Sequence, residues 1–266
     1  MTWGVADLTV VFDGSKALDA VTLHARPTVV TSVVGGDGAG KTTLLRILAG
    51  MPIPHSGTVT VPEKRRIGYV PATGGVFADL TVAENLEFSG SVYGVADPAA
   101  TAAPLLERTG LAPFTGRLAG DLSGGMRRKL SVISKMLHRP DLLILDEPTT
   151  GIDPVSRSDL WRLIAAAATG GAGVVVASAY LDESERASSV LVLNEGRTVV
   201  AGTPGEVKAS MPGAVVDVES PADPARAWRR GRLWREWLPD APPSGVLPDL
   251  EDVVIVAALA ETGGRP

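Results

Sequence analysis

Short apolar runs rich in β-branched residues alternate along the chain with stretches of helical periodicity. This alternation predicts an α/β layered domain whose strands are buried and largely parallel. The predicted strands cover residues 8–12, 29–34, 67–70, 142–145, 174–178 and 190–193. Two further segments, 18–23 and 57–61, have the character of a small antiparallel sheet, since Ser56-Gly57 is typical of a turn.

The pattern is helical between residues 77 and 140, with Pro98, Pro104 and Pro113 as breaks. We therefore predict a helical subdomain at about 77–140, inserted into the α/β layers, with no long heptad insertion. After Gly205 the residue composition and the pattern of predicted elements change. There the sequence predicts a strand at 214–219, a Trp/Arg-rich helix at 225–238, a Pro-rich stretch at 239–248 and a short helix from Asp249. We expect a main domain over residues 1–207 and a small α+β appendage over 208–266.

Composition narrows the function classes. The chain has 266 residues, of which 45% are hydrophobic and 21% charged, which is typical of a globular protein with a sizeable core. The net charge of −5 gives no global field that favours nucleic acid. The absence of cysteine excludes disulfides and thiolate chemistry. No signal segment opens the chain, and its apolar runs fall short of the roughly 20 residues that span a bilayer. We expect it to reach a membrane only through a partner.

A glycine-rich loop follows the predicted strand at 29–34 and precedes a helical run. Residues 35–42 fit the pattern G-x-x-x-x-G-K-[ST], whose backbone N–H groups and helix N-terminus bind phosphates. Lys41 is predicted to neutralise β- and γ-phosphate charge, and the Thr42 hydroxyl to bind Mg²⁺. The candidate nucleotide-binding residues here are Gly35, Gly38, Ala39, Gly40, Lys41, Thr42 and Thr43. The alternative, a purely structural turn, has no need of Lys-Thr at this offset.

Two carboxylates, Asp146 and Glu147, end the aliphatic run at 142–145. This places them at the carboxyl end of a buried strand, beside the predicted phosphate site. Asp146 suits a contact to the Mg²⁺ shell, and Glu147 suits polarisation of an attacking water, which makes it the candidate catalytic residue. The alternative is that Asp-Glu-Pro only terminates the strand.

Ser123, Gly124 and Gly125 open a predicted helix whose apolar positions are Met126, Leu130, Ile133 and Leu137. A Ser-Gly-Gly helix start combines an N-cap with bare N–H groups, which is in effect an anion-binding tip. An ordinary capped helix is the alternative. The combination with the phosphate loop and the Asp-Glu strand favours the anion-binding interpretation.

Taken together, these motifs resemble the nucleotide-binding subunit of an ATP-binding-cassette (ABC) transporter over roughly residues 5–205. Residues 150–154 resemble its D-loop, and residues 194–197 the turn after its histidine loop. The resemblance implies the P-loop NTPase fold of ABC ATPases: a parallel core sheet, a small antiparallel β subdomain and an inserted helical subdomain. It also implies ATP and Mg²⁺ as cofactors, and Phe12 as the ring that stacks on adenine. A core phenylalanine is the alternative for Phe12.

In that family two cassettes bind head to tail, with ATP between the phosphate loop of one and the signature of the other. Residues 80–86, 180–183 and 250–253 resemble the bacterial exporter branch of daunorubicin-type resistance ATPases. This branch implies a transmembrane permease partner, no nucleic acid, and a cytoplasmic location, peripheral on the inner face of the cell membrane. Closure of the cassette dimer on ATP would drive export.

The sequence departs from the family at Ala72 and Ala179, where the family usually carries Gln and His. Losing one positioned polar group commonly lowers a rate by about 10²–10⁴-fold. Together with residues 113–120, this resembles the degenerate first cassette of tandem-cassette exporters. We therefore expect firm ATP binding and weak ATPase activity in its own site, while Ser123 to Gly125 complete the site of a second cassette. A slowly hydrolysing homodimer that relies on Glu147 is the alternative.

Two other functions stay open: a non-transport cassette protein acting on ribosomes or in DNA repair, and a regulatory nucleotide-binding module. The first usually carries two cassettes or long insertions, which are absent here. An aromatic and basic cluster within 225–238 allows contact with anionic lipid or a membrane subunit. We favour an amphipathic helix whose tryptophans pack on their own domain, and the acidic chain disfavours single-stranded nucleic acid.

Overall fold

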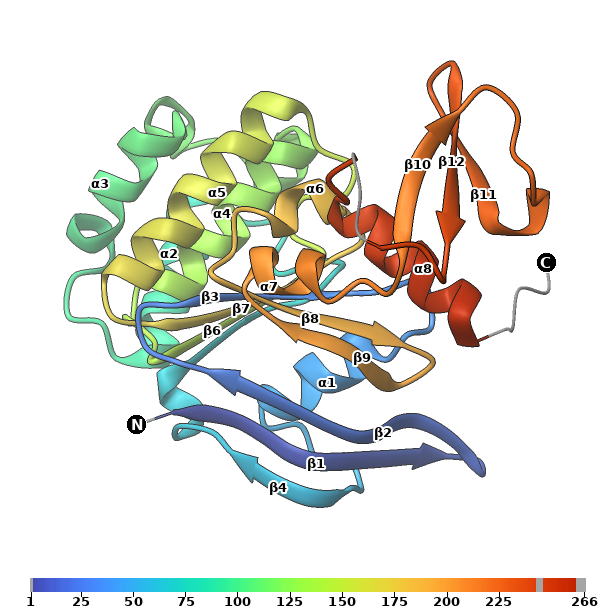
Figure 1. Cartoon of the computed structure of the whole chain (residues 1–266). Coiled ribbons are helices and arrows are strands. Elements are labelled where there is room, and N and C mark those ends of the chain that lie inside the picture. Colours follow the sequence, from blue (N-terminus) through green and yellow to red (C-terminus); the bar gives the residue numbers. More distant parts are fainter. Residues whose placement is uncertain (1, 243–245, 262–266) are drawn as a thin grey trace.

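A six-stranded, mostly parallel sheet forms the centre of the computed structural model, which describes residues 2–242 and 246–261 (Figure 1). Its strand order is β5-β6-β7-β3-β8-β9, and only β9 runs antiparallel to its neighbour. The strands are β3 (Val30–Val34), β5 (Ile67–Val70), β6 (Leu142–Asp146), β7 (Gly173–Ser178), β8 (Ser189–Asn194) and β9 (Arg197–Gly202). β3, β6 and β7 are buried along their whole length, and their sequences are accordingly dominated by aliphatic residues, with Thr31 and Ser32 as buried polar positions within β3.

A second, antiparallel sheet of order β2-β1-β4 lies below the core in Figure 1. It consists of β1 (Trp3–Phe12), β2 (Ser15–Ala25) and β4 (Ser56–Thr60). The prediction of a small antiparallel sheet is confirmed, but the assignment of residues 8–12 to the parallel strands was wrong. Asp13 and Gly14 have φ of 48° and 81°, and this tight turn folds β1 directly onto β2 as a hairpin.

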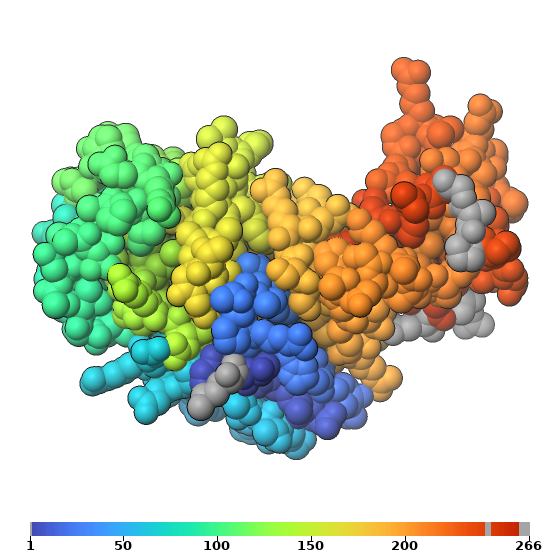
Figure 2. All heavy atoms as spheres, turned by 60° about the vertical axis from the view of Figure 1, so that its left-hand side comes forward, coloured from blue at the N-terminus to red at the C-terminus, as the bar shows by residue number. Residues whose placement is uncertain are grey.

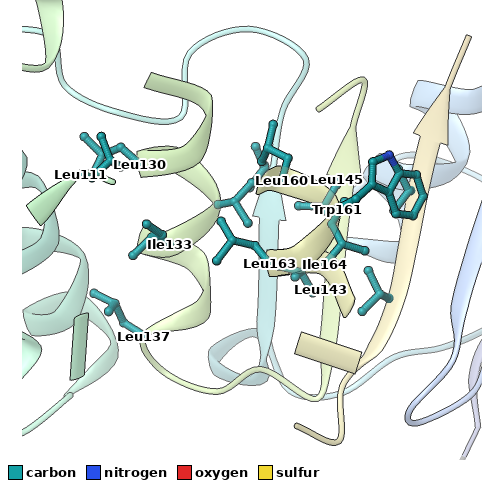
Figure 3. Close-up of a cluster of buried hydrophobic side chains, with 14 of the residues drawn as sticks. Leu111, Leu130, Ile133, Leu137, Leu143, Leu145, Leu160, Trp161, Leu163 and Ile164 are labelled. Atoms are coloured by element: carbon teal, nitrogen blue, oxygen red, sulfur yellow. The ribbon is translucent and has the colours of Figure 1, made fainter. Parts of the chain in front are cut away.

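Helices cover both faces of the core sheet. Helix α1 (Lys41–Leu48) lies between the two sheets, while α2 (Val82–Tyr93), α3 (Pro98–Thr109), α4 (Gly124–Met136) and α5 (Pro154–Thr169) gather on the other side (Figure 1). Figure 3 shows the core there: Leu160, Leu163 and Ile164 of α5 lie beside Leu143 and Leu145 of β6. Leu130 and Ile133 of α4, and Leu137 just after it, lie on the side of that helix that faces Leu111. The predicted apolar stripe of this helix is confirmed. The subdomain boundaries at about 77 and 140 stay a prediction.

The C-terminal region projects from the rest of the chain at the right of Figure 2. After α6 (Leu181–Ser184) and α7 (Pro204–Ala209), strands β10 (Ala214–Val218), β11 (Ala227–Arg230) and β12 (Leu233–Leu238) form a sheet of order β10-β12-β11. Helix α8 (Leu250–Glu261) confirms the predicted final helix.

Short 3₁₀ turns lie at Lys64–Arg66, Ala112–Phe114, Ala119–Asp121 and Pro224–Arg226. The boundary near residue 208 stays a prediction, and residues 243–245 of the Pro-rich stretch lie outside the described residues.

The predicted Trp/Arg-rich helix at 225–238 was wrong, because this segment is the β11–β12 hairpin. Gly231, with φ of 61°, makes the turn, and aromatic residues favour strands. Trp237 is buried and its Nε1 donates to the Pro212 carbonyl at 2.8 Å, so this tryptophan does pack on its own domain. Arg235 is also internal: it is buried against Asp252 of α8, with Nη1 2.7 Å from Oδ2, whereas Arg229, Arg230 and Arg232 are exposed.

No helix in the described parts of the chain is both long enough and apolar enough to span a membrane.

We expect His138, just after α4, to make the stability of the fold depend on pH. Its ring stacks on Tyr93 with 3.8 Å between ring centroids, and burial lowers the pKa of His138 from 6.5 to about 4. The unfolded chain therefore takes up a proton before the folded one as the pH falls. We expect the free energy of unfolding to decrease between pH 6.5 and about 4 by up to about 3 kcal/mol from this group. Urea unfolding at several pH values measures it. His138→Phe keeps an aromatic ring without a titrating proton, so an equal acid loss in that variant would contradict the assignment to His138.

Candidate nucleotide site

The carboxyl ends of four neighbouring parallel strands meet at one edge of the core sheet. β3 ends before Gly35, β5 before Pro71 and Ala72, β6 at Asp146, and β7 just before Ala179. In open α/β sheets, this edge is where ligands bind. The strand order thus brings together residues that lie up to more than a hundred positions apart in the sequence.

The glycine-rich loop is packed on one side and open on the other. A Cβ on Gly35 would lie 2.3 Å from the Leu193 carbonyl oxygen, and one on Gly40 would lie 2.6 Å from that of Ala17. A Cβ on Gly36 or Gly38 would meet nothing within 4 Å. The backbone therefore forms a shallow cradle with free space above it, as phosphate binding requires.

Lys41, the first residue of α1, is buried beneath this loop. Its Nζ donates to the carbonyl oxygens of Gly35 at 2.8 Å and Gly36 at 3.1 Å, and lies 3.7 Å from Oε1 of Glu147. The ammonium group is held between the loop and a carboxylate. A phosphate group entering the cradle would take over part of this pairing.

Thr42 and Asp146 form the second pair, since the Thr42 hydroxyl donates to Oδ1 of Asp146 at 3.3 Å. Asp146 is only 1% exposed, and burial raises the pKa of its carboxyl group, with the Thr42 hydrogen bond opposing that shift. A hydroxyl and a carboxylate oxygen are the hard ligands that Mg²⁺ prefers. The donor set therefore fits Mg²⁺ bound together with a nucleotide.

Glu147 is held by contacts that the sequence analysis did not predict. Its backbone is in the left-handed region, with φ of 48°. Its Oε2 accepts hydrogen bonds from the Thr150 hydroxyl at 2.9 Å and from the backbone N–H of Ala179 at 3.2 Å. Thr150 lies in the motif that follows Glu147, so its position was a usable signal. The backbone contact from residue 179 left no signal in the sequence.

Ala72 and Ala179 are both at this edge, but neither side chain carries a polar atom. Ala72 is partly buried and its carbonyl accepts a hydrogen bond from Arg128 of α4, whereas Ala179 is exposed. Arg128 is a further residue that the sequence analysis missed as part of the site, since its motif predicts only a basic position on a helix.

The residues that resemble the family signature, Ser123, Gly124 and Gly125, lie at the N-terminus of α4. The Ser123 hydroxyl oxygen accepts a hydrogen bond from the backbone N–H of Met126 at 3.2 Å, and Ser123 and Gly124 are exposed. A Cβ on Gly125 would lie 2.4 Å from the Ser156 hydroxyl oxygen, so close packing on α5 requires glycine there. Within the described residues, no hydrogen bond or ion pair joins these three residues to Lys41, Asp146 or Glu147.

Phe12 lies at the end of β1 and is 45% exposed. The alternative that it is a core phenylalanine is therefore wrong. Its role against an adenine ring stays a prediction.

A glycine-rich loop between a buried parallel strand and a helix, with an Asp-Glu pair at the same sheet edge, defines a P-loop nucleotide-binding protein. The family model described as ABC transporter matches residues 18–150, and the chain belongs to this family.

Curated relatives agree with this assignment. The chain is 43% identical over 212 residues to the probable multidrug ABC transporter ATP-binding protein YbhF of Escherichia coli, covering 75% of this chain and 36% of that protein. The chain thus spans about a third of the length of YbhF. It is 37% identical over 217 residues to the daunorubicin/doxorubicin resistance ATP-binding protein DrrA of Streptomyces peucetius, covering 77% of this chain and 66% of DrrA. The predicted resemblance to this branch is confirmed.

Solved structures share the fold. The ATP-binding subunit of an ABC transporter superposes with a TM-score of 0.69 at 25% identity, covering 79% of this chain and 92% of that one. A nucleotide-free ATP-binding cassette of an ABC transporter gives a TM-score of 0.67 at 22% identity, covering 76% and 92%. The predicted fold class is confirmed.

Proposed function

We propose that this chain is the ATP-binding subunit of a bacterial ABC exporter, and that ATP-dependent cassette dimerisation drives transport. The observation that carries the proposal is the placement of Lys41 between the phosphate loop and Glu147. The similarity to YbhF, a probable multidrug ABC transporter ATP-binding protein, and to DrrA, a daunorubicin/doxorubicin resistance ATP-binding protein, supports the export direction. The cargo class we propose is a hydrophobic drug, lipid or ion.

In the proposed site, each residue has a chemical task. Gly35 to Thr43 bind the phosphates through backbone N–H groups and the start of α1, and Lys41 neutralises their charge. Thr42 and Asp146 hold Mg²⁺, which when bound neutralises charge on the β- and γ-phosphate oxygens. Glu147 accepts a hydrogen bond from the attacking water and orients it toward the γ-phosphate. Phe12 provides an exposed ring for adenine.

Hydrolysis in this site is proposed to be slow. Neither Ala72 nor Ala179 supplies a side-chain donor, and among the described residues the contacts that orient the Glu147 carboxylate come from Thr150, Lys41 and the backbone N–H of Ala179. Missing one positioned group commonly lowers a rate by about 10²–10⁴-fold. Binding does not depend on these positions, because the cradle and Lys41 carry phosphate recognition.

The signature is proposed to serve a second cassette. Ser123 and Gly124 are exposed at the start of a 13-residue helix, so their N–H groups are available to a phosphate on another chain. We favour a heterodimer whose second cassette carries the Gln and His that this chain lacks. A homodimer that depends on Glu147 alone is the competing arrangement.

A permease is proposed to dock on an aromatic groove of about 360 Å³ beside α2. Phe77, Phe88 and Val92 are 51%, 49% and 60% exposed, and the two rings meet edge to face with 5.0 Å between centroids. Tyr69 and Pro71, which flank the end of β5, also line this groove. Exposed apolar clusters of this kind mark interaction sites. Docking here would place the chain on the cytoplasmic face of the membrane and connect the permease to Ala72.

Affinity purification of the tagged chain from detergent-solubilised membranes, with ATP and Mg²⁺ present, tests these partners. We expect a membrane protein together with a second cassette that carries the Gln and His. Recovery of a membrane protein without a second cassette would favour the homodimer. Ribosomal proteins without any membrane protein would overturn the transport function. Phe88→Asp is expected to lose the membrane protein, and the exposed position Glu107→Asp of α3 serves as the control.

A further inference from the structure

Arg128 lies on the signature helix α4 but its guanidinium group reaches the end of β5. Nη1 donates to the Pro71 carbonyl oxygen at 2.8 Å, and Nη2 donates to that of Ala72. The side chain is partly buried, whereas its neighbour Arg127 is exposed and donates to the Gly120 carbonyl at 2.9 Å. One helix therefore carries two adjacent arginines with different surroundings.

A second contact holds the same loop against α4. Gly75 has φ of 95°, and a Cβ there would lie 2.1 Å from the hydroxyl oxygen of Ser131, one helical turn after Arg128. Ser131 is fully buried. The segment from Pro71 to Gly75 thus lies directly on the signature helix, and Arg128 fixes the end of that segment nearest to the site.

The charge balance of the site gives Arg128 a further role. Asp146 and Glu147 bring two negative charges to the sheet edge, and Lys41 brings one buried positive charge. A triphosphate adds several more negative charges. The contact with Ala72 places the guanidinium group at the end of β5, next to the strand that ends at Asp146. Burial lowers the pKa of Arg128, while the charges of Asp146 and Glu147 raise it. An arginine stays protonated throughout the neutral range. Arg46 of α1 also acts on Asp146, but it is exposed and more strongly screened.

We propose that Arg128 is a positioning residue that clamps Pro71 and Ala72 to the signature helix and provides positive charge on the side of the site where Ala72 has no polar side chain. This proposal rests on the proposed function, because it requires ATP in the cradle. In the proposed site Glu147 faces the terminal phosphate, so the charge of Arg128 acts on that phosphate more than on the others. Arg128 therefore favours ATP over ADP, and it links nucleotide state to the orientation of α4.

Nucleotide titrations of the full chain at low protein concentration test the proposal. Arg128→Gln removes the charge but keeps polar atoms. We expect it to weaken Mg²⁺·ATP binding about tenfold, which corresponds to about 1.4 kcal/mol of binding free energy. Mg²⁺·ADP binding should change less than about twofold. Arg128→Lys keeps the charge and should retain most of the preference for ATP. Arg127→Gln, an equal charge change at the next residue of the helix, is the matched control and should change neither affinity. The melting temperature of each variant reports whether folding is preserved.

The outcomes separate this role from a structural one. An equal loss of ATP and ADP affinity in Arg128→Gln, or the same loss in Arg127→Gln, would overturn the proposal while leaving ATP binding by the chain intact. Failure of the unaltered chain to bind ATP at all would overturn the proposed function itself. The Ala72→Gln background gives an independent check. The added amide supplies a polar group at the same place. Arg128→Gln should therefore weaken ATP binding less in the Ala72→Gln variant than in the unaltered chain. An identical loss of ATP affinity in both backgrounds would contradict the proposed role of Arg128 beside Ala72.

Discussion

Lys41→Ala is expected to weaken ATP binding by about 30- to 4,000-fold, because removing one partner of a buried charge pair costs about 2–5 kcal/mol. The ammonium group is buried under the glycine loop and is shared by two carbonyl oxygens and Glu147. Its loss leaves the incoming phosphates facing Asp146 and Glu147 without a compensating charge. Equilibrium titration with a fluorescent ATP analogue measures the change.

Lys64→Ala is the matched control. Lys64 is exposed in a 3₁₀ turn, and this substitution removes the same charge as Lys41→Ala. Its ATP affinity should stay within about twofold of the unaltered chain, because exposed charges at a distance are screened. Unchanged ATP affinity in a folded Lys41→Ala chain would contradict the assignment of residues 35–43 as the phosphate site.

Restoring the missing side chains, with Ala72→Gln and Ala179→His together, is expected to raise the rate of hydrolysis of bound ATP by about 10²–10⁴-fold. Ala179 is exposed, so an imidazole can be accommodated, and its backbone N–H already contacts Glu147 at 3.2 Å. The added groups orient Glu147 and the attacking water, which the backbone contact alone does poorly. ATP affinity should change little, since the cradle is untouched.

Single-turnover phosphate release is the measurement, with Mg²⁺·ATP bound beforehand. Ala209→His, on the exposed surface of α7, introduces an imidazole away from the site and should leave the rate unchanged. If the double variant binds ATP normally and releases phosphate no faster, then Ala72 and Ala179 do not limit turnover in this chain.

The sequence predicts those features of the fold and site that depend on residues close together in the chain. The glycine loop, the Asp-Glu strand end and the apolar stripe of α4 depend on neighbours in the chain, so their spacing is informative. Buried parallel strands are rich in aliphatic residues, which makes β3, β6 and β7 recognisable in the sequence.

Two predicted elements were wrong because a local turn signal was given too little weight. The 225–238 segment was assigned to a helix because its Trp and Arg content outweighed Gly231, the one residue that marks the hairpin turn. Residues 8–12 were placed in the wrong sheet because the Asp13-Gly14 turn was overlooked.

The contacts of Glu147 with the backbone of residue 179, and of Arg128 with Pro71 and Ala72, join distant segments. Only the packed fold reveals such contacts, because no residue pattern within either segment encodes its partner.

Analysis of the nucleotide that stays bound to the purified chain tests most directly whether this site holds ATP without turning it over. The chain is incubated with labelled Mg²⁺·ATP, separated rapidly from free nucleotide, and the ratio of ATP to ADP on the protein is measured over time. Predominantly ATP, converting to ADP only in the Ala72→Gln/Ala179→His variant, is the expected result. Rapid accumulation of ADP on the unaltered chain would show that Glu147 suffices, and would contradict a degenerate site.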